Sequence, residues 1–159
     1  MTDADLRCFQ CRATTSTEIL GPVSGDEDPF TVTVHGLPVQ VCENGHRQFT
    51  HSKAALQRLL CLTEEGDTPL PISVQKGHLL RRAACPDCGA RLEKDSHERR
   101  TFHVEVQIAS APPFGIDVTM PLYRCRGCGK PQLRSRKEIR SHAPAALVRA
   151  LGSAGIGQG

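Results

Sequence analysis

The chain has 159 residues, of which 38% are apolar and 4% aromatic, with no Trp and a single Tyr. This apolar supply is thin for one large hydrophobic core, so we expect bound metal to help hold the fold together. No apolar run is long enough to span a membrane, and the N-terminus, 1–5, lacks the apolar segment of a secretory signal. We therefore expect a protein of a reducing, cytoplasmic compartment with no membrane partner.

The formal charge of +3 is spread unevenly along the chain. Residues 1–75 carry 5 Lys and Arg against 10 Asp and Glu, a net −5, whereas residues 76–159 carry 15 against 7, a net +8. This asymmetry predicts two surfaces with different preferences for partners. The chain also has eight cysteines, which in a reducing compartment indicate metal ligands rather than disulfides.

The first half of the chain is predicted to contain a β-hairpin. Residues 30–35, Phe-Thr-Val-Thr-Val-His, alternate between apolar and polar, which is typical of a half-buried strand. The Gly-Leu-Pro sequence at 36–38 predicts a turn, and 39–41 predicts the returning strand.

This hairpin is expected to complete a first metal cluster. Cys8 and Cys11 form a Cys-x-x-Cys pair, and Cys42 follows the returning strand. His46 is the favoured fourth ligand because it lies within the same turn, and His51 is the alternative. A first cluster that binds no metal is a third interpretation.

A helix over 53–62, capped by Ser52, is expected to close the first unit, which spans 1–66. Cys61 lies on its apolar side and is interpreted as a small buried side chain rather than a reactive thiol. Gly and Pro residues then indicate a linker over 67–82.

Two Cys-x-x-Cys pairs, each followed by a glycine, mark the second unit, 83–152. Thirty-six residues, 89–124, separate the two pairs. Each pair places two thiolates on one tight turn, as a tetrahedral zinc site requires. The predicted ligands of this second cluster are Cys85, Cys88, Cys125 and Cys128.

The second unit repeats the layout of the first. An alternating strand is expected at 102–108, and its return at 116–118 and 122–124 leads into the second cysteine pair. Ser135 and Glu138 fit a capping box for a short helix. Pro144 is expected to break this helix and start another, and 153–159 is expected to be a disordered tail.

A basic segment in the second unit is a candidate contact surface for nucleic acid or an acidic partner. Solvated charges on a helix face are the alternative interpretation. The candidate residues are Arg124, Arg126, Lys130, Arg134, Arg136, Lys137 and Arg140.

Residues 8–60 resemble the YgiT-type zinc finger, the N-terminal domain of MqsA-like antitoxins. The matching features are the first Cys-x-x-Cys pair, the apolar hairpin, Pro38 ahead of the third cysteine, the Cys42-Glu43-Asn44 run and the following helix. The resemblance implies a structural zinc ion and a partner protein, as in an antitoxin. The chain departs from that family at Gly45, where the family has its fourth cysteine, and in having a second zinc ribbon instead of a DNA-binding domain.

Together these patterns predict a small, β-rich, metal-stabilised α+β fold of two tandem zinc ribbons with two Zn²⁺ per chain. The expected function is a non-enzymatic adaptor or regulator that binds another protein. A nucleic-acid-binding regulator is the alternative. A zinc enzyme at the first cluster, with Glu43 as general base, is the minor one.

Overall fold

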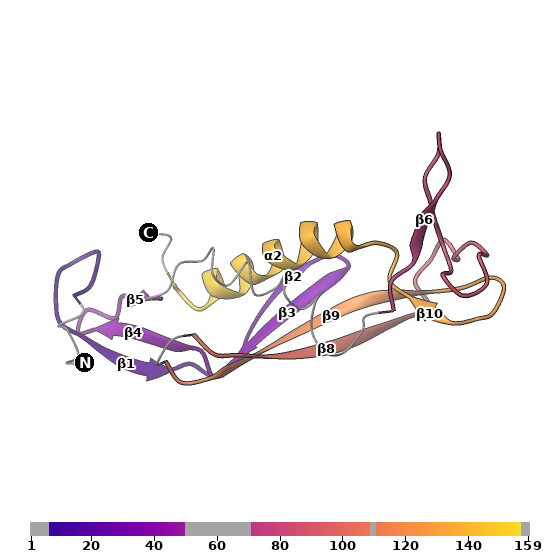
Figure 1. Ribbon diagram of the computed structural model, residues 1–159. Coiled ribbons are helices and arrows are strands. Elements are labelled where there is room, and N and C mark those ends of the chain that lie inside the picture. Colours follow the sequence, from indigo (N-terminus) through magenta and orange to yellow (C-terminus); the bar gives the residue numbers. More distant parts are fainter. Residues whose placement is uncertain (1–6, 50–70, 109–110, 157–159) are drawn as a thin grey trace.

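The computed structural model describes residues 7–49, 71–108 and 111–156. Figure 1 shows an elongated molecule in which strands run along its length and the helix lies along one face. The elements are β1 Thr15–Ile19, β2 Val23–Glu27, β3 Phe30–His35, β4 Pro38–Cys42, β5 Arg47–Gln48, β6 Val74–Lys76, β7 Arg82–Ala84, β8 Glu98–Val106, β9 Phe114–Arg124, β10 Pro131–Gln132 and α2 Arg136–Ser153. None of the helices in the described ranges is both long and apolar enough to cross a lipid bilayer.

The central sheet combines strands from both halves of the chain. β9 pairs with β8 and with β3, and β3 pairs in turn with β2, all antiparallel. In the pairing between the halves, Val34 lies opposite Ile116 and Val32 opposite Val118. The strand predicted at 30–35 is therefore confirmed, and so is the hairpin of β8 and β9, although β8 begins four residues before the predicted strand 102–108 and ends at Val106. The two halves, however, share one sheet.

The hairpin expected in the first half is not formed. β4 pairs with β1 and β5 in a separate three-stranded sheet, while β3 pairs with β2 and β9. Between β3 and β4 the chain passes from one sheet to the other at Gly36, which has a φ of 68°. Glycine tolerates this left-handed conformation, so the turn signal at 36–38 marks a change of sheet rather than a strand reversal.

The helix α2 packs across the sheet made by both halves. Ser135 is its N-cap, and the Glu138 backbone N–H donates to the Ser135 hydroxyl at 3.3 Å, as predicted. The expected break at Pro144 is wrong, because the helix continues through it to Ser153. Burial of one apolar face compensates for the backbone hydrogen bond that proline lacks. The buried residues of this face are Ile139, Ala143, Ala146, Leu147, Ala150 and Leu151.

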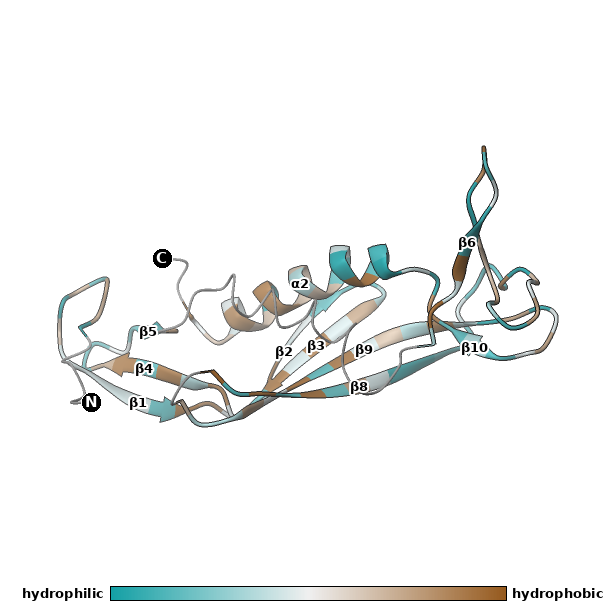
Figure 2. Ribbon diagram, viewed as in Figure 1, coloured by the Kyte–Doolittle hydropathy of each residue, from teal (hydrophilic) through white to brown (hydrophobic). Residues whose placement is uncertain are grey.

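One hydrophobic core joins the halves, and Figure 2 shows it as the brown segments of β3, β9 and α2. Phe30 and Val32 of the first half are buried with Met120 and Leu147 of the second. A tandem arrangement of two ribbons, each with its own hairpin and trailing helix, is not confirmed, because these elements pack together.

The C-terminal segment also joins this core. Ala154 and Ile156 are both buried, so the disorder expected from residue 153 is wrong for 153–156. The backbone N–H of Ile156 donates to the Leu151 carbonyl at 3.2 Å, and Ile156 forms a β-bridge with Arg47.

The described part of the predicted linker, 71–82, contains most of a β-hairpin that extends to Ala84. β6 pairs with β7, and the Ser73 backbone N–H donates to the Leu133 carbonyl at 3.0 Å. The helix predicted at 53–62, with Cys61, and the alternative ligand His51 lie outside the described residues. The unit boundaries at 66 and 83 stay predictions.

Candidate metal centres

The second cluster forms where the end of β9 meets the turn that follows β7. All four predicted sulfurs lie within 4.8 Å of one another. The Sγ atoms of Cys85 and Cys128 are 3.7 Å apart, and those of Cys88 and Cys125 are 3.4 Å apart. A tetrahedron with metal–sulfur bonds of ~2.3 Å has edges of about 3.8 Å. The spacing therefore suits a four-coordinate metal ion.

Local hydrogen bonds stabilise thiolates in the second cluster. The Gln132 side-chain amide donates to the Cys85 Sγ at 2.9 Å, and the Gly127 backbone N–H donates to the Cys125 Sγ at 3.4 Å. The pKa of Cys85 is lowered to about 6, mainly by the backbone N–H of Cys88 and, against the effect of burial, by Gln132. For Cys128, the backbone N–H of Lys130 lowers the pKa, but burial and the neighbouring thiols outweigh it and raise the pKa to about 11.

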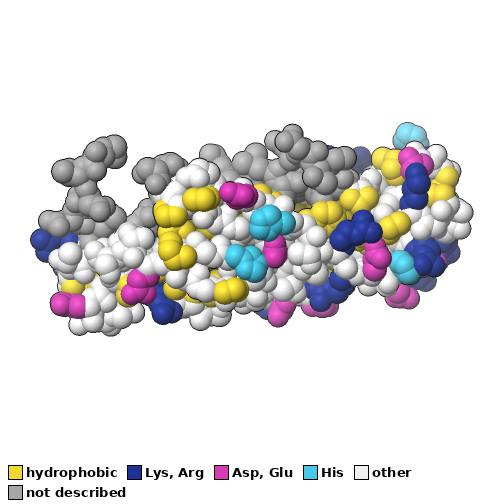
Figure 3. Space-filling view, turned by 90° about the horizontal axis from the view of Figure 1, so that it is seen from below, with side chains coloured by type: hydrophobic (Ala, Val, Ile, Leu, Met, Phe, Trp, Pro, Cys, Tyr) yellow, Lys and Arg dark blue, Asp and Glu magenta, His cyan; other side chains and the backbone are white. Residues whose placement is uncertain are grey.

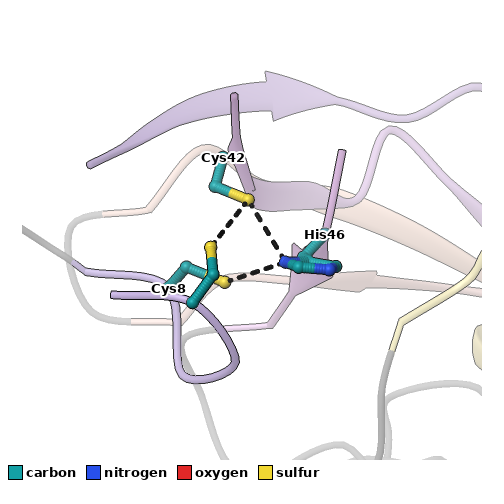
Figure 4. A group of neighbouring side chains, drawn as sticks. Cys8, Cys42 and His46 are labelled. Carbon is teal, nitrogen blue, oxygen red and sulfur yellow. Dashed lines mark hydrogen bonds between the residues drawn. The ribbon is translucent and has the colours of Figure 1, made fainter. Parts of the chain in front are cut away.

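The first cluster contains the four ligands favoured from the sequence: Cys8, Cys11, Cys42 and His46. Figure 4 shows the His46 ring pointing its Nδ1 atom at the sulfurs. This nitrogen lies 3.6 Å from the Sγ atoms of both Cys8 and Cys42, and the Cys11 and Cys42 sulfurs are 3.7 Å apart. Bonds of ~2.3 Å to sulfur and ~2.05 Å to nitrogen give a tetrahedral sulfur–nitrogen edge of about 3.6 Å. The geometry therefore suits a metal bound by three thiolates and one imidazole.

A side chain that the sequence analysis did not select assists the first cluster. The Asn44 amide donates to the Cys11 Sγ at 3.3 Å. This bond is the main reason that the pKa of Cys11 is lowered to about 6. Thiolates at Cys11 and Cys8 in turn raise the pKa of His46. A metal ion must displace that proton before the imidazole can bind it.

Asn44 and Gln132 act in the same way on the two clusters. In the sequence, Asn44 belongs to the Cys42-Glu43-Asn44 run of the family resemblance, and no pattern singles out Gln132. Gln132 is 3% exposed, although its Oε1 atom has no hydrogen-bond partner. A polar side chain just beyond the last cysteine of a pair is the signal that could have identified it, because such amides support metal ligands.

The seven cysteines that the structure describes form no disulfide. They belong to two clusters at opposite ends of the molecule, because β4 and β5 lie at one end in Figure 1 and β10 lies at the other. All four donors in each cluster are side chains of this chain. Two metal ions, one at each end, are therefore what these residues can hold.

Three of the candidate basic residues interact with neighbouring side chains. Arg124 hydrogen bonds to His97 at 2.6 Å, and Lys130 forms an ion pair with Asp87 at 2.5 Å. The Arg134 guanidinium lies 4.0 Å from the centroid of the Tyr123 ring. These three side chains are engaged within the second half.

The other four basic residues lie in two places. Arg126 lines a shallow hollow with Glu93, Lys94 and Asp95. Arg136 and Lys137 begin α2, where they line a hollow of about 590 Å³ together with Arg81. Arg140 is exposed one turn further along the helix.

The sheet face opposite α2 carries a cluster that sequence reasoning missed. Asp117 of β9 accepts from His35 of β3 at 2.8 Å and from His103 of β8 at 2.6 Å. Figure 3 shows histidine and acidic side chains adjacent on this face. The cluster joins three strands of both halves. Its residues are 82 and 14 positions apart along the chain, so no local pattern predicts it.

No protein-family model, curated protein or solved structure matches this chain. The resemblance of residues 8–60 to the YgiT-type zinc finger therefore stays a prediction from the sequence.

Proposed function

We propose that this protein is a non-enzymatic, zinc-binding adaptor or regulator that acts by binding another protein. The observation that carries the proposal is that each cluster offers four protein donors at tetrahedral spacing. Structural zinc sites are closed in this way, whereas catalytic sites keep one position for water or substrate. Thiolate-rich donor sets favour Zn²⁺ among the common divalent ions, although iron also binds four thiolates.

The charge distribution supports a role in binding. Within the described residues, the first half carries 3 Lys and Arg against 5 Asp and Glu and the second half 15 against 7, and the two halves share one core. The resemblance to an antitoxin domain, which binds a protein partner, points in the same direction.

The test combines metal analysis with partner binding. The purified chain is expected to contain two zinc ions. A tagged copy is expected to retain a stoichiometric protein partner that binds again when both are purified. A chain with four protein ligands on each zinc but with no such partner would contradict the binding role. A water ligand on the first zinc would instead favour the enzyme.

A nucleic-acid-binding regulator is the second candidate. The hollow lined by Arg81, Arg136 and Lys137 favours it, since three cations around one space suit a phosphate group. This candidate predicts salt-dependent binding of DNA or RNA that weakens when Arg134, Arg136 and Lys137 are all replaced by Gln. If the chain binds neither DNA nor RNA at low salt, the nucleic-acid-binding candidate is excluded.

A further inference from the structure

The hairpin of β6 and β7 projects away from the rest of the molecule (Figure 1). Three residue pairs join its strands, from Val74 opposite Ala84 to Lys76 opposite Arg82. Its turn carries two adjacent leucines, Leu79 and Leu80, which are 99% and 85% exposed. They are the most exposed large apolar side chains in the part of the chain that the structure describes.

The backbone of the turn keeps these leucines outside. Gly77 has a φ of 114°, and a Cβ atom placed on it would lie 2.4 Å from the Leu80 carbonyl oxygen. Only glycine permits both this conformation and this close approach. The turn therefore closes tightly on its own backbone, and both leucine side chains are exposed to solvent.

The hairpin is also strongly basic. Residues 74–84 contain Lys76, Arg81 and Arg82 and no Asp or Glu. Arg81 lies in the turn, just before β7, and it lines the hollow of about 590 Å³ with Arg136 and Lys137 at the start of α2. Cationic residues thus flank the two leucines along the sequence of the hairpin and continue onto the body of the protein.

We infer that this hairpin is the docking element of the protein. Its partner is a protein surface in which carboxylates surround an apolar pocket that receives Leu79 and Leu80. Apolar side chains that enter a pocket supply most of the affinity at such contacts, while the surrounding charges set specificity and speed of association. This inference rests on the proposed role in protein binding and names the surface and the chemistry of the partner.

Two other partners fit the hairpin less well. A nucleic acid supplies phosphates for the cations but no apolar pocket for two leucines. Lipid-binding segments that rely on charge carry about four to eight Lys or Arg next to an apolar anchor, and stable anchoring takes two strong signals. The hairpin has three cations and two leucines, so a lipid surface would hold it only marginally.

The test uses the full zinc-loaded chain as bait for a phage-displayed library of random 12-residue peptides. We expect the enriched peptides to combine Asp or Glu with Leu, Ile or Phe. Their affinity is expected to fall about tenfold or more when Leu79 and Leu80 are both replaced by Ser. It should also fall with rising salt and in a variant with Arg81→Gln and Arg82→Gln.

A matched control removes a different exposed apolar side chain. Ile19 of β1 is 56% exposed and lies outside the hairpin, so Ile19→Ser should leave the peptide affinity unchanged. Circular dichroism and zinc content should show that all variants stay folded, because the replaced side chains make no part of the core.

A fluorescent reporter distinguishes a peptide from a lipid surface. The chain has no Trp, so Leu79→Trp places a single Trp at the tip. Its emission is expected to shift to the blue with a selected peptide but not with vesicles of phosphatidylcholine and phosphatidylglycerol at 7:3. A shift with vesicles alone, a library without hairpin-dependent binders, or peptides without acidic residues would each overturn the inference. A natural partner that binds the Ser variants normally would overturn it while leaving the proposed function intact.

Discussion

Arg12, which follows the first cysteine pair, adopts a left-handed backbone conformation. In both cysteine pairs of the second cluster, the equivalent position is a glycine. The φ of Arg12 is 64°, and the equivalent residues Gly89 and Gly129 have φ values of 75° and 74°. In all three turns this residue donates its backbone N–H to the carbonyl of the first cysteine of the pair, at 2.9–3.0 Å. The left-handed conformation costs an L-residue about 1–2 kcal/mol. The first cluster therefore contains a strained residue that the second does not.

We predict that Arg12→Gly raises the free energy of unfolding by up to about 1 kcal/mol, because relief of strain exceeds the extra flexibility of glycine in the unfolded chain. Chemical denaturation of the zinc-loaded protein measures this change. Gly129→Ala is the converse control, since no atom lies within 4 Å of the added Cβ and only the φ penalty remains. The free energy of unfolding of Gly129→Ala should be about 1 kcal/mol lower than that of the unaltered protein. A lower free energy of unfolding in both variants would contradict the strain at Arg12.

Asp117 makes stability depend on pH. Burial raises the pKa of its carboxyl group, but the hydrogen bonds from His103 and His35 outweigh burial and lower the pKa below the usual 3.8. The unfolded state then binds a proton more readily than the folded state. The stabilisation is complete above about pH 4 and is lost as the pH falls through the folded pKa.

We predict that Asp117→Asn lowers the free energy of unfolding by about 1 kcal/mol at neutral pH, because the amide keeps only one oxygen for the two histidines. The difference from the unaltered protein should shrink as the pH falls below 3.8, the usual pKa of the carboxyl group. Urea denaturation of both proteins across this range measures it. The comparison cancels the loss of metal at low pH, which both proteins share. A difference that grows in acid would contradict the direction of the pKa shift.

At the scale of elements, the position of α2 depends on one glycine of β2. A Cβ atom on Gly25 would lie 2.2 Å from the Ala146 carbonyl oxygen and 2.3 Å from the Ala150 backbone nitrogen. The helix backbone therefore rests directly on the strand. Near the same contact, Arg149 of α2 forms an ion pair with Glu27 of β2 at 2.6 Å.

We predict that Gly25→Ala lowers the free energy of unfolding by about 2–3 kcal/mol or more, because the helix must move away from the sheet. Thermal denaturation measures the loss. Gly21→Ala is the matched control, because no atom lies within 4 Å of its added Cβ, and it should change stability little. Equal effects at the two glycines would show that the helix does not rest on β2.

Local patterns predicted elements better than they predicted pairing. The alternation of Phe30, Val32 and Val34 identified β3, because a strand with one buried face must repeat every two residues. It did not identify β9 as the partner, since that pairing depends on packing between distant segments. Pro144 illustrates the same limit: local preference predicts a break, and burial of the helix face overrides it.

The ligands of both clusters were accessible from the sequence, because cysteine spacing and turn geometry are local properties. The supporting amides and the His35–Asp117–His103 cluster were not, because Gln132 meets Cys85 at a separation of 47 residues and Asp117 meets His35 at 82. Leu79 and Leu80 lie in the predicted linker, 67–82, where no strand or helix pattern is clear. Their exposure on a hairpin was therefore not predicted either.

At the scale of the whole molecule, the shared core should make loss of either metal a global event. Cys125 follows β9, the strand that pairs with β3 of the first half. A structural zinc contributes about 10–16 kcal/mol in small finger peptides, compared with a typical net stability of about 5–15 kcal/mol.

We therefore predict that Cys125→Ser destabilises both halves together. On heating, the variant should unfold in one transition, and the midpoint of that transition should be lower than in the unaltered protein. Calorimetry of the variant, with the far-UV spectrum as a second measurement, tests this. Arg126→Ser, next to the same cysteine, is the control and should keep both metals. Two separate transitions would mean that the halves fold independently, and an unchanged midpoint would mean that the second metal is not structural.

The pairing of β3 with β9 also constrains how the protein forms during synthesis. β2 precedes β3, but β9, the strand on the other edge of β3, begins only at Phe114, so the ribosome must make most of the chain before that edge is covered. Until then β3 is paired only with β2, and its other edge, with the apolar face of Val32 and Val34, is exposed to aggregation or to chaperones. A nascent chain released before β9 is made would contain all four ligands of the first metal. It would lack β9, the strand that completes the central sheet.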